Sequence, residues 1–152
     1  MKDDTATDLE SLLEIAPRPE TGVRREPIPA ELNRISGQVV DAAYKVHSGL
    51  GPGLLESVYE VCLAHELNRR GLSVERQVEV PVEYDGLRLD AGLRLDLLVE
   101  RSIVVELKSA EALLPVHTAQ VLTYLKLTGC RVGLLINFNV PLIRDGIKRI
   151  VF

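Results

Sequence analysis

The feature of this sequence that most constrains its fold is a change in the spacing of its apolar residues near residue 72. Apolar residues recur at helical spacing between residues 31 and 70, whereas they alternate with polar residues from Val74 to Val99. The alternating stretch is divided by Asp85 and Gly86, a pair typical of a tight turn between antiparallel strands. The spacing therefore predicts two helices followed by an antiparallel hairpin.

The remaining elements are marked by helix breakers and short apolar runs. Helices are expected over residues 31–47, before the Gly- and Pro-rich breaker at 48–53, over about 54–70, and over 115–128. Strands are expected over residues 74–84, 87–99 (continuous or broken at Gly92), 103–108 and 131–138, with a short closing strand over 147–152. The order ααβββαβ(β) predicts an α/β fold: a mixed central sheet with antiparallel hairpins, flanked by helices.

Residues 1–30 differ from the rest of the chain and are expected to form a leader in front of a domain at 31–152. Four prolines interrupt the second half of this leader, and an apolar cluster lies at residues 9–15. The leader is interpreted as a mobile tail or, alternatively, as a segment that docks on a partner through that cluster.

The charge and the cysteine content limit the partners and the compartment. The formal net charge is −4, and residues 1–30 contribute most of it, with 4 basic and 7 acidic residues. This balance argues against coating nucleic acid by bulk charge but allows a local basic groove. Because no apolar run suits a membrane helix or a secretory signal, and because the two cysteines lie far apart, we expect a cytoplasmic protein without a membrane partner.

Three charged residues interrupt the apolar strands. Glu106 and Lys108 are two apart in an expected strand, so their side chains project from the same face. If Val99 pairs with Ile103, Asp96 lies directly across from Glu106, with Cβ atoms about 5 Å apart. Two carboxylates this close repel unless a proton or a cation lies between them, and Mg²⁺ binds such oxygens. The alternative is an ion pair between Lys108 and one of the acids on an exposed sheet face.

Two of the expected helices carry further polar residues at helical spacing. Glu56, Tyr59 and Glu60 share one side of the second helix, and Gln120 and Tyr124 share one side of the third. Taken singly, each is better explained by a solvated helix face or by core packing. They become candidates only together with the charged strand residues.

The segment at residues 53–59 reads Gly-x-x-Glu-x-x-Tyr and resembles the small bacterial proteins of the GxxExxY family. The resemblance continues through residues 76–77, 80–82, 94–98, 105–108, 117–126, 134–140 and 145–149, and it covers about residues 32–152. That family resembles the PD-(D/E)XK nuclease superfamily. The resemblance therefore implies a restriction-endonuclease-like core and metal-dependent hydrolysis of phosphodiester bonds in nucleic acid, with DNA as the expected substrate.

The resemblance also implies roles for individual residues. Asp96 and Glu106 would be the main ligands of Mg²⁺ or Mn²⁺, helped by the Leu107 carbonyl and, directly or through water, by Glu56. Lys108 would contact the attacking water or the phosphate. These four charged side chains are the expected catalytic set.

Three residues are expected to position substrate. Gln120 and Tyr124 match a Gln-x-x-x-Tyr motif that lies beside the active site in one nuclease branch, and Tyr59 is a weaker candidate for the same neighbourhood. The alternative function is a non-catalytic binding or assembly subunit that keeps the nuclease fold. No helix-turn-helix, zinc finger or long basic helix is visible in the sequence, so a homodimer or a protein partner would help to hold the substrate.

Overall fold

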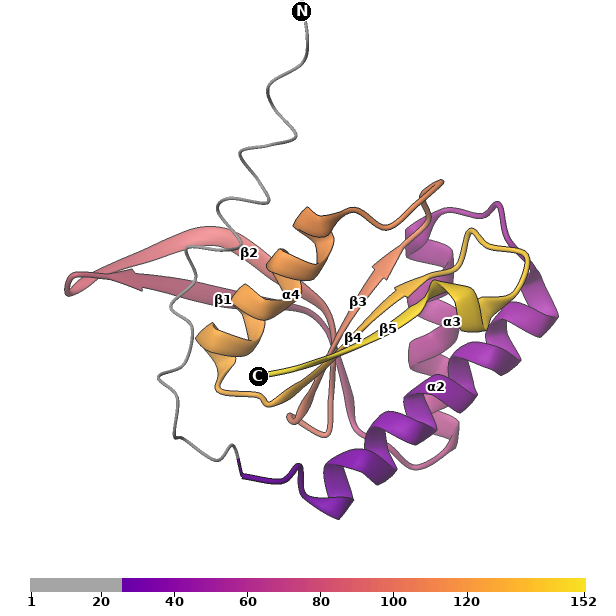
Figure 1. Cartoon of the computed structure of the whole chain (residues 1–152), viewed down its shortest axis with the longest axis horizontal. Coiled ribbons are helices and arrows are strands. Elements are labelled where there is room, and N and C mark those ends of the chain that lie inside the picture. The colour runs from indigo at the N-terminus through magenta and orange to yellow at the C-terminus, as the bar shows by residue number, and fades with distance from the viewer. Residues whose placement is uncertain (1–25) are drawn as a thin grey trace, which may run out of the picture.

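Five strands form one mixed sheet in which the spatial order follows the chain, β1-β2-β3-β4-β5 (Figure 1). A computed structural model describes residues 26–152, so the hypotheses on the leader concern mainly residues that lie outside the described part of the chain. The strands are β1 Val74–Tyr84, β2 Leu87–Val99, β3 Ile103–Lys108, β4 Val132–Asn137 and β5 Ile147–Val151. Only β3 and β4 run parallel, and α4 (Pro115–Thr128) connects them. The predicted mixed sheet and element order are confirmed.

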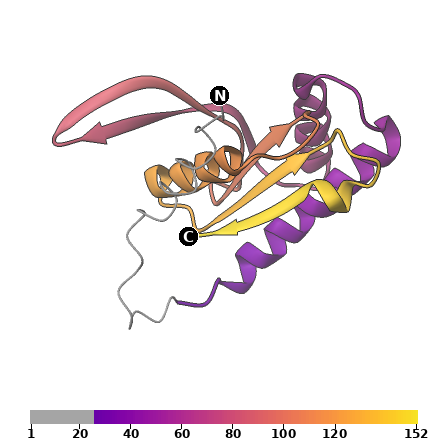
Figure 2. The same cartoon turned by 45° about the horizontal axis from the view of Figure 1, so that its top comes forward.

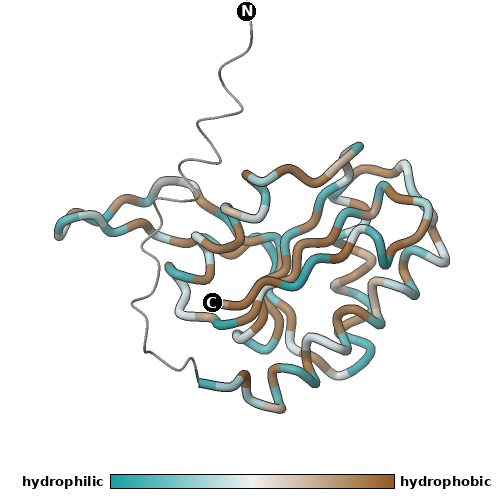
Figure 3. The backbone as a smooth tube through the Cα atoms, viewed as in Figure 1, coloured by the Kyte–Doolittle hydropathy of each residue, from teal (hydrophilic) through white to brown (hydrophobic). Residues whose placement is uncertain are grey.

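Helices cover both faces of the sheet and divide the core in two. Helices α2 (Ala30–Leu50) and α3 (Glu56–Arg69) pack on one face through aliphatic residues such as Leu63 and Leu67, whereas α4 packs on the other through Val121 and Leu125. Every residue of β4 is buried, as expected for a strand between two helical layers. In Figure 3 the hydrophobic segments gather in the central strands, and hydrophilic residues mark the tip of the β1–β2 hairpin.

The sheet splits into two arms between β2 and β3. These strands pair only from Leu97 opposite Val105 to Val99 opposite Ile103. Beyond that point β2 stays paired with β1, with a shift of register between Val80 and Val82, while β3 continues beside β4 as far as Lys108. Figures 1 and 2 show the result: the β1–β2 hairpin leaves in one direction and strands β3 to β5 in the other. We call the point of divergence the fork.

The hairpin also exchanges its two faces at the fork. Leu95 and Leu97 would share a face in a regular strand, yet Leu95 packs in the α4 core and Leu97 in the α2–α3 core. Arg76 pairs with Leu97 and Val78 pairs with Leu95, so Gln77 lies opposite Asp96. The backbone of Gln77 is left-handed, with φ of 51°. Such a conformation costs a non-glycine residue on the order of 1–3 kcal/mol. The left-handed residue Gln77 lies at the point where the hairpin exchanges its faces, and it accounts for the reversal.

The expected element boundaries agree closely with the structure, except at the end of α2 and before β5. Helix α2 continues through Leu50 and ends at Gly51, whose φ of 67° suits glycine. Strand β2 is continuous through Gly92. A short 3₁₀ helix at Ile143–Gly146, which the apolar pattern did not reveal, precedes β5. In residues 26–152, the helices are too short or too polar to span a bilayer, and both cysteines are free thiols.

Gly133 in β4 offers a test of how closely α4 packs on the sheet. A Cβ atom at this position would lie 2.6 Å from Val121 Cγ1. Val121 is fully buried, and its β-branched side chain has little rotational freedom to move away. We expect Gly133→Ala to lower the free energy of unfolding by about 1–3 kcal/mol through overpacking. Urea denaturation of the purified protein measures this change.

The matched control is Gly37→Ala in α2, where an added Cβ meets no atom within 4 Å. Because alanine favours helix over glycine by about 1 kcal/mol, this variant should be at least as stable as the wild type. Equal effects of the two substitutions would contradict the close packing of α4 on β4.

Candidate active site

Asp96 lies where β2 separates from β3, and its carboxylate completes the backbone hydrogen bonding there. Asp96 Oδ2 accepts a hydrogen bond from the Leu107 backbone N–H at 2.8 Å. That N–H belongs to the stretch of β3 that no longer pairs with β2. The expected pairing of Val99 with Ile103 is present, and the ladder ends at Leu97 and Val105. Asp96 and Glu106 are the next residues of the two strands, and their carboxyl groups still interact.

Glu106 is a buried acid with an unsatisfied oxygen. Its exposed fraction is 4%, and its Oε2 atom is buried without a hydrogen-bond partner in residues 26–152. Burial, together with hydrogen bonding and negative charge from Asp96, raises the pKa of Glu106 to about 9. In the absence of a cation, Glu106 is therefore protonated at neutral pH.

Lys108 lies at the end of β3, half-buried and beside the two acids. Within residues 26–152, no carboxylate lies within ion-pairing distance of its ammonium group. Its charge nevertheless acts on the neighbours: it opposes the rise in the pKa of Glu106 and, together with burial, lowers the pKa of His117. The alternative interpretation, an ordinary salt bridge to one acid, does not describe this lysine.

Glu56 begins α3, and the end of β3 holds that helix start in place. Ser109, directly after β3, donates from Oγ to the Leu54 carbonyl at 2.6 Å. Burial raises the pKa of Glu56, Asp96 and Glu60 add to the rise, and Lys108 opposes it. Glu56 therefore lies within electrostatic range of Asp96 and Lys108, although the residue as a whole is exposed to solvent.

Tyr59 lies in the core. It is fully buried, and its ring stacks on Phe138 with centroids 4.4 Å apart. Its hydroxyl donates to the Gly51 carbonyl at 2.6 Å and accepts from the Leu54 N–H at 3.1 Å. Tyr59 thus fixes the loop that leads to Glu56, and its role in positioning substrate stays a prediction.

Gln120 and Tyr124 lie on α4, the helix that packs on the other face of the sheet. Gln120 Nε2 donates to the Tyr124 hydroxyl at 3.1 Å. Burial raises the pKa of Tyr124, and the charges of Glu106 and Asp96 contribute to the rise. The hydroxyl therefore lies near the carboxylate pair, while His117 uses Nδ1 to accept the Leu114 N–H at the start of the helix.

The oxygens at the fork suit a hard divalent cation. A buried carboxylate oxygen without a partner, beside a second carboxylate and a backbone carbonyl, matches the ligands that Mg²⁺ prefers, with water completing the shell. Among residues 26–152, however, no three side chains of the types His, Cys, Asp and Glu converge closely enough to hold a metal by themselves. The fit therefore rests on Asp96 and Glu106, and Glu56 as a ligand stays a prediction.

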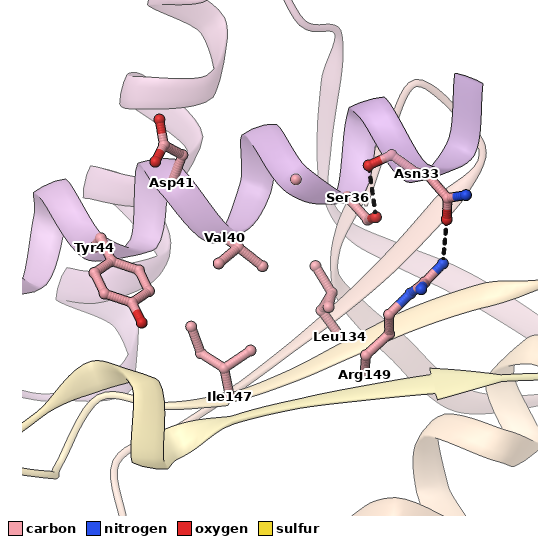
Figure 4. A pocket seen from close by; sticks show the side chains of 9 residues that line it. Asn33, Ser36, Val40, Asp41, Tyr44, Leu134, Ile147 and Arg149 are labelled. Atoms are coloured by element: carbon pink, nitrogen blue, oxygen red, sulfur yellow. Dashed lines mark hydrogen bonds between the residues drawn. The ribbon is translucent and has the colours of Figure 1, made fainter. Parts of the chain in front are cut away.

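One hollow in the described part of the chain lies away from the fork. A depression of about 510 Å³ runs between α2 and β5, where Val40 and Tyr44 face Ile147 and where Arg149 donates to Asn33 (Figure 4). It contains none of the predicted site residues. We assign the chemistry to the fork because the buried, unsatisfied carboxylate is there, whereas the hollow has no comparable group.

The sequence analysis missed Gln77 as a functional candidate and gave Glu60 no separate role. Glu60 is buried and accepts from Gln77 Nε2 at 2.6 Å; the same nitrogen lies 3.4 Å from Asp96 Oδ1. One signal was present: the apolar alternation skips a position between Val74 and Val78. That gap marks the place where the strand reverses its faces.

Comparison with known proteins identifies the family of the chain. Residues 33–150 match the family model described as the PD-(D/E)XK nuclease superfamily. The chain belongs to this superfamily. No curated protein and no solved structure matched the chain.

Membership in the PD-(D/E)XK nuclease superfamily confirms the expected restriction-endonuclease-like fold and indicates a nuclease-type function. Membership implies a nucleic acid substrate, and nucleases of this superfamily generally depend on a divalent metal. The narrower resemblance to the GxxExxY family stays a prediction.

The raised pKa of Glu106 gives a pH prediction for the metal-free protein. Between about pH 4.5 and pH 9 the folded state keeps a proton that the unfolded state has released, so this group makes stability fall as pH rises. One group contributes a slope of at most about 1.4 kcal/mol per pH unit. Glu106→Gln, which stays neutral, should remove that contribution.

Urea denaturation in EDTA at several values between about pH 5 and pH 9 compares the two proteins. Parallel pH profiles for wild type and Glu106→Gln would show that Glu106 does not carry the proton.

Proposed function

We propose that this protein is a divalent-metal-dependent nuclease that hydrolyses phosphodiester bonds, with DNA as the expected substrate. The observation that carries the proposal is the buried, unsatisfied Glu106 oxygen beside Asp96. A buried polar atom without a partner is rare in proteins and calls for an explanation. A cation held between the two acids would supply one.

Asp96 and Glu106 would hold the cation, with the Leu107 carbonyl and, directly or through water, Glu56. Mg²⁺ or Mn²⁺ bound there lowers the pKa of water and neutralises charge on the scissile phosphate. Superfamily membership supports this chemistry in general terms.

Lys108 is proposed to act on the attacking water or on the phosphate. Its ammonium has no carboxylate partner in the described residues, so its donors are free for substrate. A positive charge already in place stabilises negative charge that develops in the transition state. Tyr124 and Gln120 would orient substrate or Lys108 from α4.

The alternative remains a binding or assembly subunit that keeps the fold. It explains the near-neutral charge of residues 31–152 but gives no reason for a buried acid, Glu106, beside the half-buried Asp96 and a lysine without a carboxylate partner in the described residues. A cleavage assay on linear, plasmid and single-stranded DNA and on RNA, with Mg²⁺, Mn²⁺ or EDTA, separates the two functions. Failure to cleave any of them would favour the binding subunit.

Lys108→Ala separates catalysis from metal binding. Because an ammonium cannot bind a cation, we expect this variant to keep its Mg²⁺ affinity and to cleave about 10²–10³-fold more slowly. Glu106→Ala should lose both metal binding and cleavage. Single-turnover cleavage at saturating Mg²⁺ and calorimetric titration measure the two properties.

Lys126→Ala is the matched control. This exposed lysine in the last turn of α4 lies 5.8 Å from the Phe152 ring centroid and takes no part in the proposed mechanism. It should cleave like the wild type. If Lys108→Ala also cleaves at the wild-type rate, the proposed role of Lys108 is wrong.

The protonated state of Glu106 also makes a prediction about metal binding. A carboxyl group must lose its proton to bind a cation, so binding at pH 7 should release about one proton. Calorimetric titrations in buffers that differ in ionisation enthalpy count the protons released. A cation that binds without proton release would not be held by Glu106.

A further inference from the structure

Glu60, Gln77 and Asp96 form a chain of polar contacts that joins α3, β1 and β2 beside the fork. Gln77 Nε2 donates to Glu60 Oε1 at 2.6 Å and to Asp96 Oδ1 at 3.4 Å. The other oxygen of Glu60 accepts from Arg76 Nη2 at 3.3 Å. Both oxygens of this buried acid are thus engaged, and one amide connects it to Asp96.

The chemistry of the neighbours fixes the orientation of the Gln77 amide. An ionised carboxylate only accepts hydrogen bonds, so an amide between two carboxylates must turn its NH₂ group toward both. Glu60 therefore holds Gln77 in the orientation that donates to Asp96. Since Oδ2 of Asp96 already accepts the Leu107 N–H, Gln77 restrains the second oxygen of the same carboxylate.

The backbone gives an independent reason to assign a role to this side chain. Gln77 has φ of 51° in the middle of a strand, a conformation that glycine adopts with less strain. Strained residues of this kind cluster at functional sites, where the surrounding structure holds them. A glutamine at this position keeps a hydrogen-bond donor that glycine would lack.

We infer that Gln77, held by Glu60, is a positioning residue that orients Asp96 toward the divalent cation. This inference rests on the proposed metal-dependent function and adds two residues to it. Groups that hold a metal ligand in place commonly contribute 10–100-fold to metal affinity. Since the Leu107 N–H also holds Asp96, removing the Gln77 donor should reduce the metal affinity by about tenfold, near the lower end of this range.

Calorimetric titration of the full chain with Mn²⁺ tests the inference. Gln77→Met keeps the length of the side chain but removes its donors, so its Kd for Mn²⁺ should rise about tenfold. The matched control is Gln38→Met, since Gln38 is a half-buried glutamine on α2 that accepts from Arg70. The Kd of this control should stay within about twofold of the wild type.

The variant Gln77→Gly removes the side-chain donors of Gln77 and also relieves the backbone strain at this position. It should lose as much affinity for Mn²⁺ as Gln77→Met does, while its melting temperature in EDTA stays within a few degrees of the wild type.

Variants of Glu60 test whether Glu60 affects metal binding through its hydrogen bond with Gln77. Glu60→Gln keeps an acceptor for Gln77 and should bind Mn²⁺ within about threefold of the wild type, whereas Glu60→Leu should weaken binding as Gln77→Met does. The double variant Gln77→Met with Glu60→Leu should bind no more weakly than either single variant, because both remove one contact chain.

The outcomes are distinguishable. If the wild type binds Mn²⁺ and Gln77→Met binds it equally well, the positioning role is wrong and the proposed function stands. Equal losses in Gln77→Met and Gln38→Met, or additive losses in the double variant, also overturn the positioning role. If the wild type binds neither Mn²⁺ nor Mg²⁺, the proposed function and this inference both fail.

Discussion

The hydrogen bond between the Asp96 carboxylate and the Leu107 N–H is the contact on which the candidate site depends. Where β2 leaves β3, the backbone of β3 loses its neighbour on that side. Leu107 is almost completely buried, and an unsatisfied buried N–H costs about 1–3 kcal/mol. Asp96 supplies the missing acceptor at 2.8 Å. The same carboxylate therefore accepts the hydrogen bond of the Leu107 N–H at the opened edge of β3 and lies beside Glu106.

The electrostatics of the fork favour binding over stability. Two acids and a lysine are gathered in a partly buried space, where Glu106 is protonated in the absence of a cation and Lys108 has no carboxylate partner among the described residues. A core built only for stability would pair these charges or replace them with apolar residues. A buried acid with a raised pKa next to a half-buried lysine is typical of sites where function sets the residue types.

Much of this architecture could be predicted from local sequence signals. The turn at Asp85 and Gly86, and α4 with Pro115 at its first residue and Gly129 in a left-handed cap, follow from residue types that few other conformations favour. The shared face of Glu106 and Lys108 follows from strand parity. These features depend on residues close together in the chain.

The reversal at Gln77 could not be predicted in the same way. Both faces of the sheet are buried at the fork, so the leucines of β2 alternate regularly in the sequence even though they change cores between Leu95 and Leu97. Apolar alternation identifies a strand but not which of two buried faces a side chain enters. The contact of Gln77 with Glu60 also joins residues 17 positions apart on different elements. Similarly, helical spacing alone did not place Tyr59 in the core.

The fork explains how groups from opposite layers can act on one site. In an unbroken sheet, the strands would separate residues on the α3 side from residues on the α4 side. Here the divergence of β2 and β3 opens the sheet next to Asp96 and Glu106, so that Glu56 and Tyr124 both influence, or are influenced by, the same acids. Gln77 serves this arrangement from β1, because the strand reverses its faces there and its side chain meets α3. The irregularity of the hairpin is thus part of the site, since it joins the two layers at the carboxylate pair.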